Sequence, residues 1–150
     1  MEKFNKLICY ILALANFAKD IHYSCHGESF YGKHLFADRI QENMYEYIDQ
    51  IKEICILGND EEPLPSGEYL SRATSLIPAK SDNDDLENFR SMKALMLNTL
   101  THIESMDGMT VGEENLIGNI AQDVQNNLGL VNQQVKEWVG YKKKQEQTHR

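Results

Sequence analysis

The chain has 150 residues, and 41% of them are hydrophobic, which suits one domain with a single buried core. A formal net charge of −8 argues against a nucleic-acid-binding module whose whole surface is basic. The three cysteines form no even disulfide framework, so the composition favours a cytoplasmic protein over a secreted one; they are Cys9, Cys25 and Cys55.

Residues 3–25 are predicted to form the first helix. The apolar run Leu7–Ala15 follows two lysines, a pattern that also imitates a secretory signal. The run is too short to span a membrane, and the polar residues Lys19 and Asp20 continue it as an amphipathic helix. Gly27 then ends the helix. We therefore expect a bundle helix here and no membrane segment.

A second helix is predicted over residues 30–57, because apolar side chains recur there every three or four positions. Pro63 and Pro65 each remove a backbone donor, so the chain leaves helical geometry after this helix. Ser66 is expected to cap a short helix that ends near residue 76. This short helix would cross between the two halves of a bundle.

The remaining chain predicts two more long helices. The apolar period from Leu86 to Ile103 marks the third helix, and Asp107-Gly108 predicts a turn after it. A fourth helix would begin with a capping box formed by Thr110 and Glu113, with apolar positions as far as Trp138.

Four long helices with a long crossover between the second and third form a ferritin-like bundle. We therefore predict an all-α fold, a ferritin-like four-helix bundle with a short extra helix in that crossover. The bundle would occupy residues 1–141, and residues 142–150 would form a basic C-terminal tail.

Five potential metal ligands lie at successive spacings of 12, 4, 11 and 4 residues: His22, His34, Asp38, Asp49 and Glu53. Imidazole nitrogens mixed with carboxylate oxygens suit a redox iron better than a closed structural zinc site. The last four form two i, i+4 pairs, and each pair projects from one helix face about one turn apart. The pattern predicts a metal site.

The step from Asp38 to Asp49 is close to three helical turns, which places the two pairs on one face but roughly 16 Å apart. A single metal cluster does not span that distance. If two copies of the helix packed antiparallel about a twofold axis, His34 and Asp38 would lie beside Asp49 and Glu53 of the second copy, and the arrangement would occur twice. The spacing thus predicts a site between subunits.

These residues carry a resemblance to a known family. The stretch His22-Tyr23-Ser24-Cys25-His26-Gly27, then Phe30 and the four other candidate ligands at unbroken spacing, resembles the ferroxidase motif of the Dps family of mini-ferritins, the DNA-binding proteins from starved cells. The match is densest over about residues 20–58, and the rest agrees in length and helix order. The sequence departs from the family pattern at Tyr23 and Gly129, at or near which the family usually has Trp. These departures affect the electron-donating and radical-trapping role attributed to the Trp residues, and they do not affect metal ligation.

The resemblance implies an iron-sequestering ferroxidase. Such a protein oxidises Fe(II) with hydrogen peroxide or dioxygen, stores ferric mineral in a hollow shell and protects against oxidative damage. The implied assembly is a dodecamer built from twofold dimers, each with intersubunit di-iron sites that zinc can also fill. His22 would join Asp49 and Glu53 of the partner chain around a tighter Fe(II) position, with Glu53 bridging to a looser iron at His34 and Asp38. Candidate acids for the iron pore are Asp107, Glu113, Glu114 and Asp123.

The alternative is a Dps-like structural or DNA-compacting shell protein with an inactive or zinc-filled site. Its DNA contact would be the tail, through Lys142, Lys143, Lys144 and Arg150, because basic side chains release counterions from DNA. An alternative interpretation of the same tail is a solubilising helix end whose positive charges match the helix dipole. Twelve copies of −8 give a formal charge of about −96, which would repel DNA except at the tails, so DNA binding is not favoured.

Two smaller patterns receive less weight. Cys25 and His26 lie beside His22 and could form a soft-metal cluster, but three such residues at a helix end more often reflect local turn chemistry. Glu146-x-x-His149 has the spacing of a di-iron ligand pair, yet it falls in the polar tail, and we treat it as chance.

Overall fold

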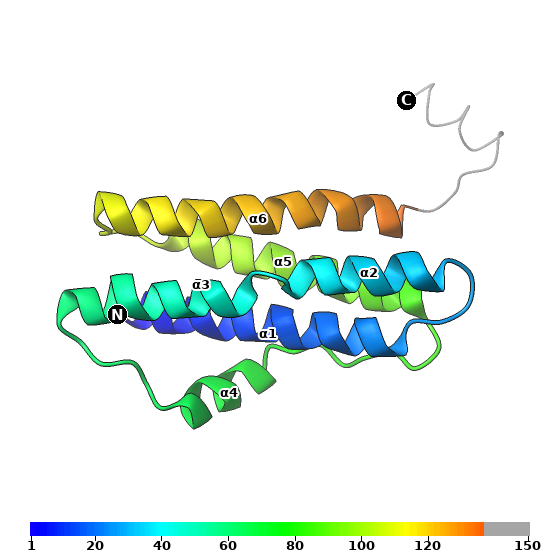
Figure 1. The fold of residues 1–150 in the computed structure, drawn as a ribbon, viewed down its shortest axis with the longest axis horizontal. Coiled ribbons are helices and arrows are strands. Elements are labelled where there is room, and N and C mark those ends of the chain that lie inside the picture. The colour runs from blue at the N-terminus through cyan, green and yellow to red at the C-terminus, as the bar shows by residue number, and fades with distance from the viewer. Residues whose placement is uncertain (137–150) are drawn as a thin grey trace, which may run out of the picture.

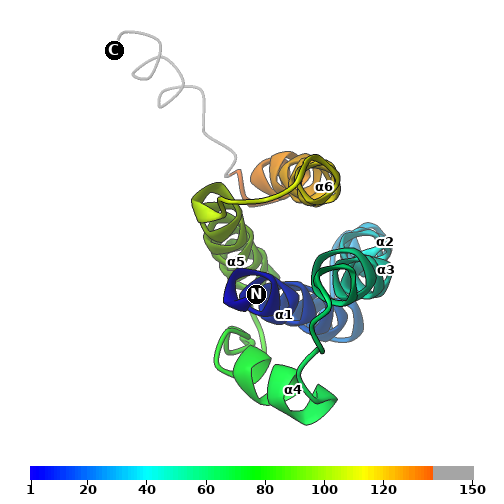
Figure 2. The ribbon, with the colours of Figure 1, turned by 90° about the vertical axis from the view of Figure 1, so that its left-hand side faces the viewer.

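The computed structural model describes residues 1–136, and each regular element in that range is a helix (Figure 1). In chain order they are α1 (Glu2–Ser24), α2 (Phe30–Gln41), α3 (Met44–Gln50), η1 (Ile51–Ile56), η2 (Leu57–Asn59), α4 (Ser66–Thr74), α5 (Asp85–Ser105) and α6 (Val111–Val135). Viewed end-on, α1, α5, α6 and the α2–α3 pair form the bundle, and α4 lies outside it beside α1 (Figure 2). The predicted all-α bundle with a crossover helix is confirmed.

Helix α1 is surrounded on several sides, since it contacts α2, α3, α4 and α5. Its side chains from Leu7 to Leu14 are buried at every position except Tyr10, which is half-buried. This explains the apolar run that imitates a secretory signal, because a helix enclosed by neighbours is apolar nearly all round. In the part of the chain that the structure describes, no helix is both long and apolar enough to cross a membrane.

Helix α4 is fixed to α1 by a buried tyrosine. The Tyr69 hydroxyl donates to Asn5 Oδ1 at 2.6 Å and accepts from the Leu64 backbone N–H at 3.1 Å. Both Tyr69 and Asn5 are buried, so this pairing satisfies polar groups that would otherwise cost free energy in the core. At the surface, Arg72 adds ion pairs to Glu2 at 2.7 Å and to Glu68 at 3.1 Å.

The prediction of one continuous helix over residues 30–57 is wrong. The chain turns at Glu42 and Asn43 between α2 and α3, and η1 then adopts the wider π-helical geometry before the short 3-10 turn η2. Asn43 has φ −103° and ψ 3°, outside helical values, and its side chain donates to Asp123 Oδ2 on α6 at 3.4 Å. Asparagine side chains favour such breaks because they compete for hydrogen bonds with the helix. The straight-helix spacing between Asp38 and Asp49 therefore does not apply.

The last two long helices begin with side-chain caps. The Asp84 carboxylate accepts from the Glu87 backbone N–H at 3.0 Å at the start of α5, and the predicted capping box of Thr110 and Glu113 is confirmed at the start of α6. Such caps satisfy donors that the first helical turn leaves unpaired. Helix α6 ends at Val135; Trp138, the tail over 142–150 and the Glu146/His149 pair lie outside the described residues.

Candidate metal centre

His22 and His34 come together at one end of the bundle. His22 lies in the last turn of α1, His34 lies in α2, and the intervening loop turns through Gly27, whose φ of +73° favours glycine. His22 Nδ1 lies 2.7 Å from the His34 carbonyl oxygen, and His34 Nδ1 lies 2.6 Å from the His22 carbonyl oxygen. Each histidine thus holds the backbone of the other.

These two bonds fix the chemistry of both rings. A carbonyl oxygen only accepts hydrogen bonds, so each Nδ1 must carry the proton and donate. In a neutral imidazole the Nε2 atom then keeps its lone pair, which is the usual state of a metal-binding histidine whose other nitrogen donates to a carbonyl. His22 and His34 are therefore suited to present two nitrogen ligands.

The two imidazoles form the middle of a column of four rings. They stack with their centroids 3.6 Å apart and their planes at 16°. Tyr23 packs edge-on to His22 at 4.8 Å, and Phe30 stacks on His34 at 5.3 Å. Tyr23 is 76% exposed and Phe30 is 43% exposed, so aromatic surface flanks the histidine pair.

Asp38 lies one turn after His34 but is paired with a lysine. The Lys19 ammonium lies 3.4 Å from Asp38 Oδ1, and Gln41 Nε2 donates to the same oxygen at 3.0 Å. The hydrogen bond from Lys19, together with its charge, lowers the pKa of the Asp38 carboxyl. Asp38 is therefore a carboxylate at neutral pH, but a metal ion would compete with Lys19 for it.

The sequence predicts Lys19 only as a polar residue of the first helix, and its ion pair with Asp38 was not predicted. Its ammonium also lies 5.9 Å from the centroid of the Tyr23 ring. A signal was present, because Lys19 precedes His22 by three residues on α1, and residues three apart share a helix face.

Asp85, at the start of α5, holds the loop before α2 and the first turn of α2, which contains Lys33 next to His34. It accepts from Lys33 Nζ at 2.8 Å and from the His26 backbone N–H at 3.0 Å. Burial would raise the pKa of the Asp85 carboxyl, but these hydrogen bonds and charges outweigh it and lower the pKa. Lys33 immediately precedes His34, so this ion pair helps position the histidine.

Asp49 and Glu53 lie apart from the histidines. Asp49 is exposed near the end of α3, and Glu53 is exposed in the π-helical segment η1. Within residues 1–136, no three or more His, Cys, Asp or Glu side chains gather closely enough to hold a metal ion. One copy of the chain brings His22 and His34 together and leaves the two carboxylates elsewhere.

The expectation that Glu113 is a pore acid is wrong, because its side chain is buried. Its carboxylate accepts from the Thr110 backbone N–H at 2.9 Å and from Asn59 Nδ2 at 3.0 Å, so it caps the start of α6. Asp123 accepts from the Tyr47 hydroxyl at 2.7 Å. Asp107 and Glu114 are exposed.

The structure does not favour any of the three cysteines as a metal ligand. All three are free and buried, and burial raises the pKa of the Cys25 thiol. The imidazole of His26 points to another partner, with Nδ1 at 3.3 Å from Asp85 Oδ1. Cys9 and Cys55 are small core residues, as expected.

Comparison with known proteins identifies the architecture. No protein-family model matches the chain, and no curated protein matches its sequence. Among solved structures, Dps from Thermosynechococcus elongatus is similar with a TM-score of 0.80 and 16% identity, over 93% of this chain and 91% of that one. A mutant of Mycobacterium smegmatis Dps1 is similar with a TM-score of 0.72 and 14% identity, over 90% and 93%. The chain therefore has the ferritin-like helical fold of the Dps proteins.

Proposed function

We propose that this protein is an iron-sequestering ferroxidase that works as a homo-oligomeric shell. It would oxidise Fe(II) with hydrogen peroxide or dioxygen at a site shared by two copies of the chain, and would retain the ferric product inside the shell as mineral. The observation that carries the proposal is the His22–His34 pair, whose Nδ1 atoms are both bound to carbonyl oxygens.

The donor set fits ferrous iron. Two imidazole nitrogens and the carboxylates of Asp38, Asp49 and Glu53 form the mixed nitrogen and oxygen environment that non-haem iron accepts. Neutral imidazoles and ionised carboxylates bind a divalent cation without first releasing a proton. The ring column of Tyr23 and Phe30 would restrict water around the histidines once a partner covers it.

A second copy would complete the site. A twofold contact that sets His22, His34 and Asp38 against Asp49 and Glu53 of the second copy would create two equivalent sites, because such a contact is isologous. The exposed positions of Asp49 and Glu53 leave both carboxylates free to face another chain. The similarity in fold to two Dps structures supports a shell of the same kind.

Two irons bound side by side would reduce hydrogen peroxide without releasing a hydroxyl radical. Two Fe(II) ions give one electron each to hydrogen peroxide, and with two protons the products are two Fe(III) ions and two water molecules. A lone Fe(II) supplies one electron and releases a hydroxyl radical instead. The work of the chain is to hold both Fe(II) substrates side by side, with Glu53 as the bridging carboxylate. The free, buried cysteines suit a reducing cytoplasm as the place of action.

The test is anaerobic loading with Fe(II), addition of peroxide, and near-ultraviolet absorbance of the ferric product. We expect His34→Ala and Asp38→Ala to slow oxidation by about tenfold or more, and Glu53→Ala to be the most damaging, with the assembly intact in each. His102→Ala is the matched control, because His102 bonds to the Lys3 carbonyl oxygen at 2.8 Å, away from the site. Wild-type rates in all three site variants would overturn the proposal.

One observation favours the alternative, a Dps-like structural or DNA-compacting shell with an inactive or zinc-filled site. The Lys19 ammonium already pairs with Asp38, one of the five candidate ligands. If this ion pair keeps Fe(II) out, the assembly should form and bind zinc at the remaining ligands without oxidising iron. Zinc binding in the absence of any peroxide-dependent iron oxidation would select this alternative.

A further inference from the structure

A polar groove of about 800 Å³ lies on the side of the bundle where α6 faces the α2–α3 pair (Figure 2). Six of its eight lining side chains are amides, among them Asn43, Asn119 and Asn126. The other two are the carboxylate of Asp123 and the ring of Tyr47. The groove therefore offers many neutral oxygens and a single negative charge.

This groove faces away from the contact proposed for a second copy. Tyr47 lines the groove, and Asp49 follows it by two residues, which is about 200° around the helix axis. Asp49 therefore lies on roughly the opposite side of α3 from the groove. A ligand in the groove does not compete with the proposed twofold contact, and it does not depend on the proposed iron chemistry.

The Asp123 carboxylate has one oxygen with close partners and one without. Its Oδ2 accepts from the Tyr47 hydroxyl at 2.7 Å and from Asn43 Nδ2 at 3.4 Å. Its Oδ1 has only the long contact with Asn127 Nδ2 at 3.5 Å. In the part of the chain that the structure describes, no ammonium or guanidinium group lies within ion-pair distance of Asp123. A half-buried carboxylate without a cation favours one from outside the chain.

The Tyr47 hydroxyl acts as a donor and not as a ligand. Burial, and then the hydrogen bond and charge of Asp123, raise the pKa of this hydroxyl, so it stays protonated at neutral pH. It therefore holds Oδ2 of Asp123 and leaves Oδ1 for another group.

A buried amide beside Asp123 gives independent support for a ligand. Asn127 is only 2% exposed, and its Oδ1 has no hydrogen-bond partner among residues 1–136. Exchanging the amide nitrogen and oxygen would turn the carbonyl oxygen toward the Asp123 carboxylate, which also only accepts, so the orphaned atom is not an error of orientation. A buried carbonyl without a donor costs free energy. A hydrated cation at Asp123 Oδ1 would satisfy both oxygens, because its bound water molecules donate hydrogen bonds.

We propose that this groove binds a hard divalent cation of the Mg²⁺ or Ca²⁺ class, which keeps part of its water shell. Asp123 Oδ1 would be the charged ligand, and the bound water molecules would donate to the amide oxygens around it. Carboxylate, amide and water oxygens suit Mg²⁺ and Ca²⁺, whereas imidazole nitrogens such as those of His22 and His34 suit iron and zinc. The width of the groove and its single carboxylate favour a partly hydrated ion over a closely caged one.

Calorimetric titration of the full-length protein with Ca²⁺ and, separately, with Mg²⁺ would measure this binding and show which ion the groove prefers. We expect a dissociation constant of about 0.1–1 mM, as for other weak oxygen-ligand sites. Asp123→Asn removes the charged ligand, keeps an acceptor for Tyr47, and should weaken binding at least tenfold. Glu114→Gln is the matched control, because it removes an exposed carboxylate from the same helix, and it should bind like the wild type.

Terbium luminescence would locate the bound ion. Tb³⁺ is a luminescent substitute for Ca²⁺, and a tyrosine ring excites it only at short range. The emission that Ca²⁺ displaces should be lost in Tyr47→Phe and kept in Tyr45→Phe, because Tyr45 is exposed on the same helix and does not line the groove.

A second variant keeps the result interpretable if Asp123→Asn does not fold. Asn126→Lys places an ammonium group at an exposed position of the groove and should abolish cation binding without disturbing the core. Wild-type affinity in both variants would overturn the proposal. So would the absence of Ca²⁺ and Mg²⁺ binding by the wild type, because a water molecule alone would then satisfy Asn127. Emission lost in Tyr45→Phe and kept in Tyr47→Phe would assign the ion to the side of α3 that carries Asp49, and would also overturn it.

Discussion

Lys19 connects a predicted metal ligand to an exposed aromatic ring. It pairs with Asp38 at 3.4 Å, and its ammonium lies over the Tyr23 ring, which packs edge-on to His22. Because this positive charge opposes a divalent cation at the same carboxylate, Lys19→Met should tighten Zn(II) or Co(II) binding to the full-length chain by about fivefold. Calorimetric titration would measure the change.

Lys6→Met is the control for this charge, because Lys6 lies on the same helix and is exposed. Its metal affinity should equal that of the wild type. Weaker metal binding in Lys19→Met would show that Lys19 positions Asp38 for the metal and does not compete with it.

Glu113 gives the fold a pH dependence that can be assigned to one residue. Burial would raise the pKa of its carboxyl, but hydrogen bonds from Thr110 and Asn59 outweigh burial and lower the pKa below its usual 4.5. The folded state then holds fewer protons than the unfolded chain near that pH. The stabilisation is present above about pH 4.5 and is lost as the pH falls through the lowered value.

Glu113→Gln should therefore unfold more easily than the wild type at neutral pH, by about 1.5–3 kcal/mol, the usual contribution of a hydrogen bond to a charged group. The difference should shrink as the pH is lowered below about 4. Urea unfolding at a series of pH values would measure it, with the exposed neighbour variant Glu114→Gln as control. A difference that stays constant with pH would exclude Glu113 as the source.

Local signals in the sequence located the helices well. The predicted helices over 3–25 and 66–76 correspond to α1 and α4, and the third corresponds to α5. Their limits depend on prolines, glycines and caps, which are readable from the sequence. The break at Asn43 was missed because apolar periodicity continues across it, and the contact of Asn43 with Asp123 joins residues far apart in the chain.

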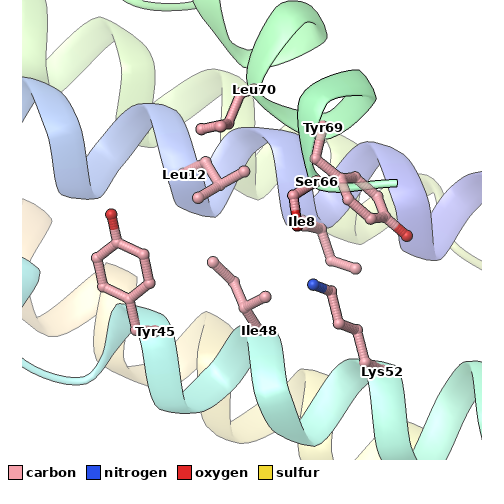
Figure 3. Close-up of a pocket in the computed structure, with 8 residues that line it drawn as sticks. All are labelled: Ile8, Leu12, Tyr45, Ile48, Lys52, Ser66, Tyr69 and Leu70. Carbon is pink, nitrogen blue, oxygen red and sulfur yellow. The ribbon is translucent and has the colours of Figure 1, made fainter. Parts of the chain in front are cut away.

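The candidate metal centre was predictable in composition but not in contacts. The spacing from His34 to Asp38 stays within α2 and survives the break, because that break comes after Gln41. The reciprocal bonds between His22 and His34 depend on how α1 and α2 pack, which no spacing reveals. A pocket lined by residues of α1, α3, η1 and α4, among them Lys52 and Tyr69 (Figure 3), also could not be foreseen, because it forms only when α4 packs beside α1 and α3.

The aromatic surface around the histidines predicts that copies of the chain associate. Tyr23 and Tyr31 are 76% and 69% exposed, and exposed aromatic surface of this kind commonly marks an interface. We expect light scattering to show a stable oligomer for the wild type and a smaller species for Tyr23→Lys. Leu97→Lys on α5 is the control, because Leu97 is 45% exposed but lies on a different helix. A wild-type monomer that binds two irons tightly would contradict the shared site.

The charge of the whole chain predicts that any DNA binding would be confined to residues 142–150. Four basic residues against Glu146 give residues 142–150 a charge of +3, which leaves −11 for residues 1–141 from the total of −8. Deleting 142–150 should abolish any DNA affinity and leave iron oxidation unchanged. Gel shifts between about 50 and 200 mM salt would test this, and a shift retained after truncation, or insensitive to salt, would place the contact elsewhere.

The separation of His22 and His34 from Asp49 and Glu53 has a thermodynamic consequence for the proposed shell. When two copies share each metal, metal binding and subunit association are linked, and each strengthens the other by the same factor. Dilution of the protein should then release metal, and a chelator should favour dissociation. For such a protein, a higher concentration of iron and a higher concentration of the chain would each increase the fraction of chains assembled into shells.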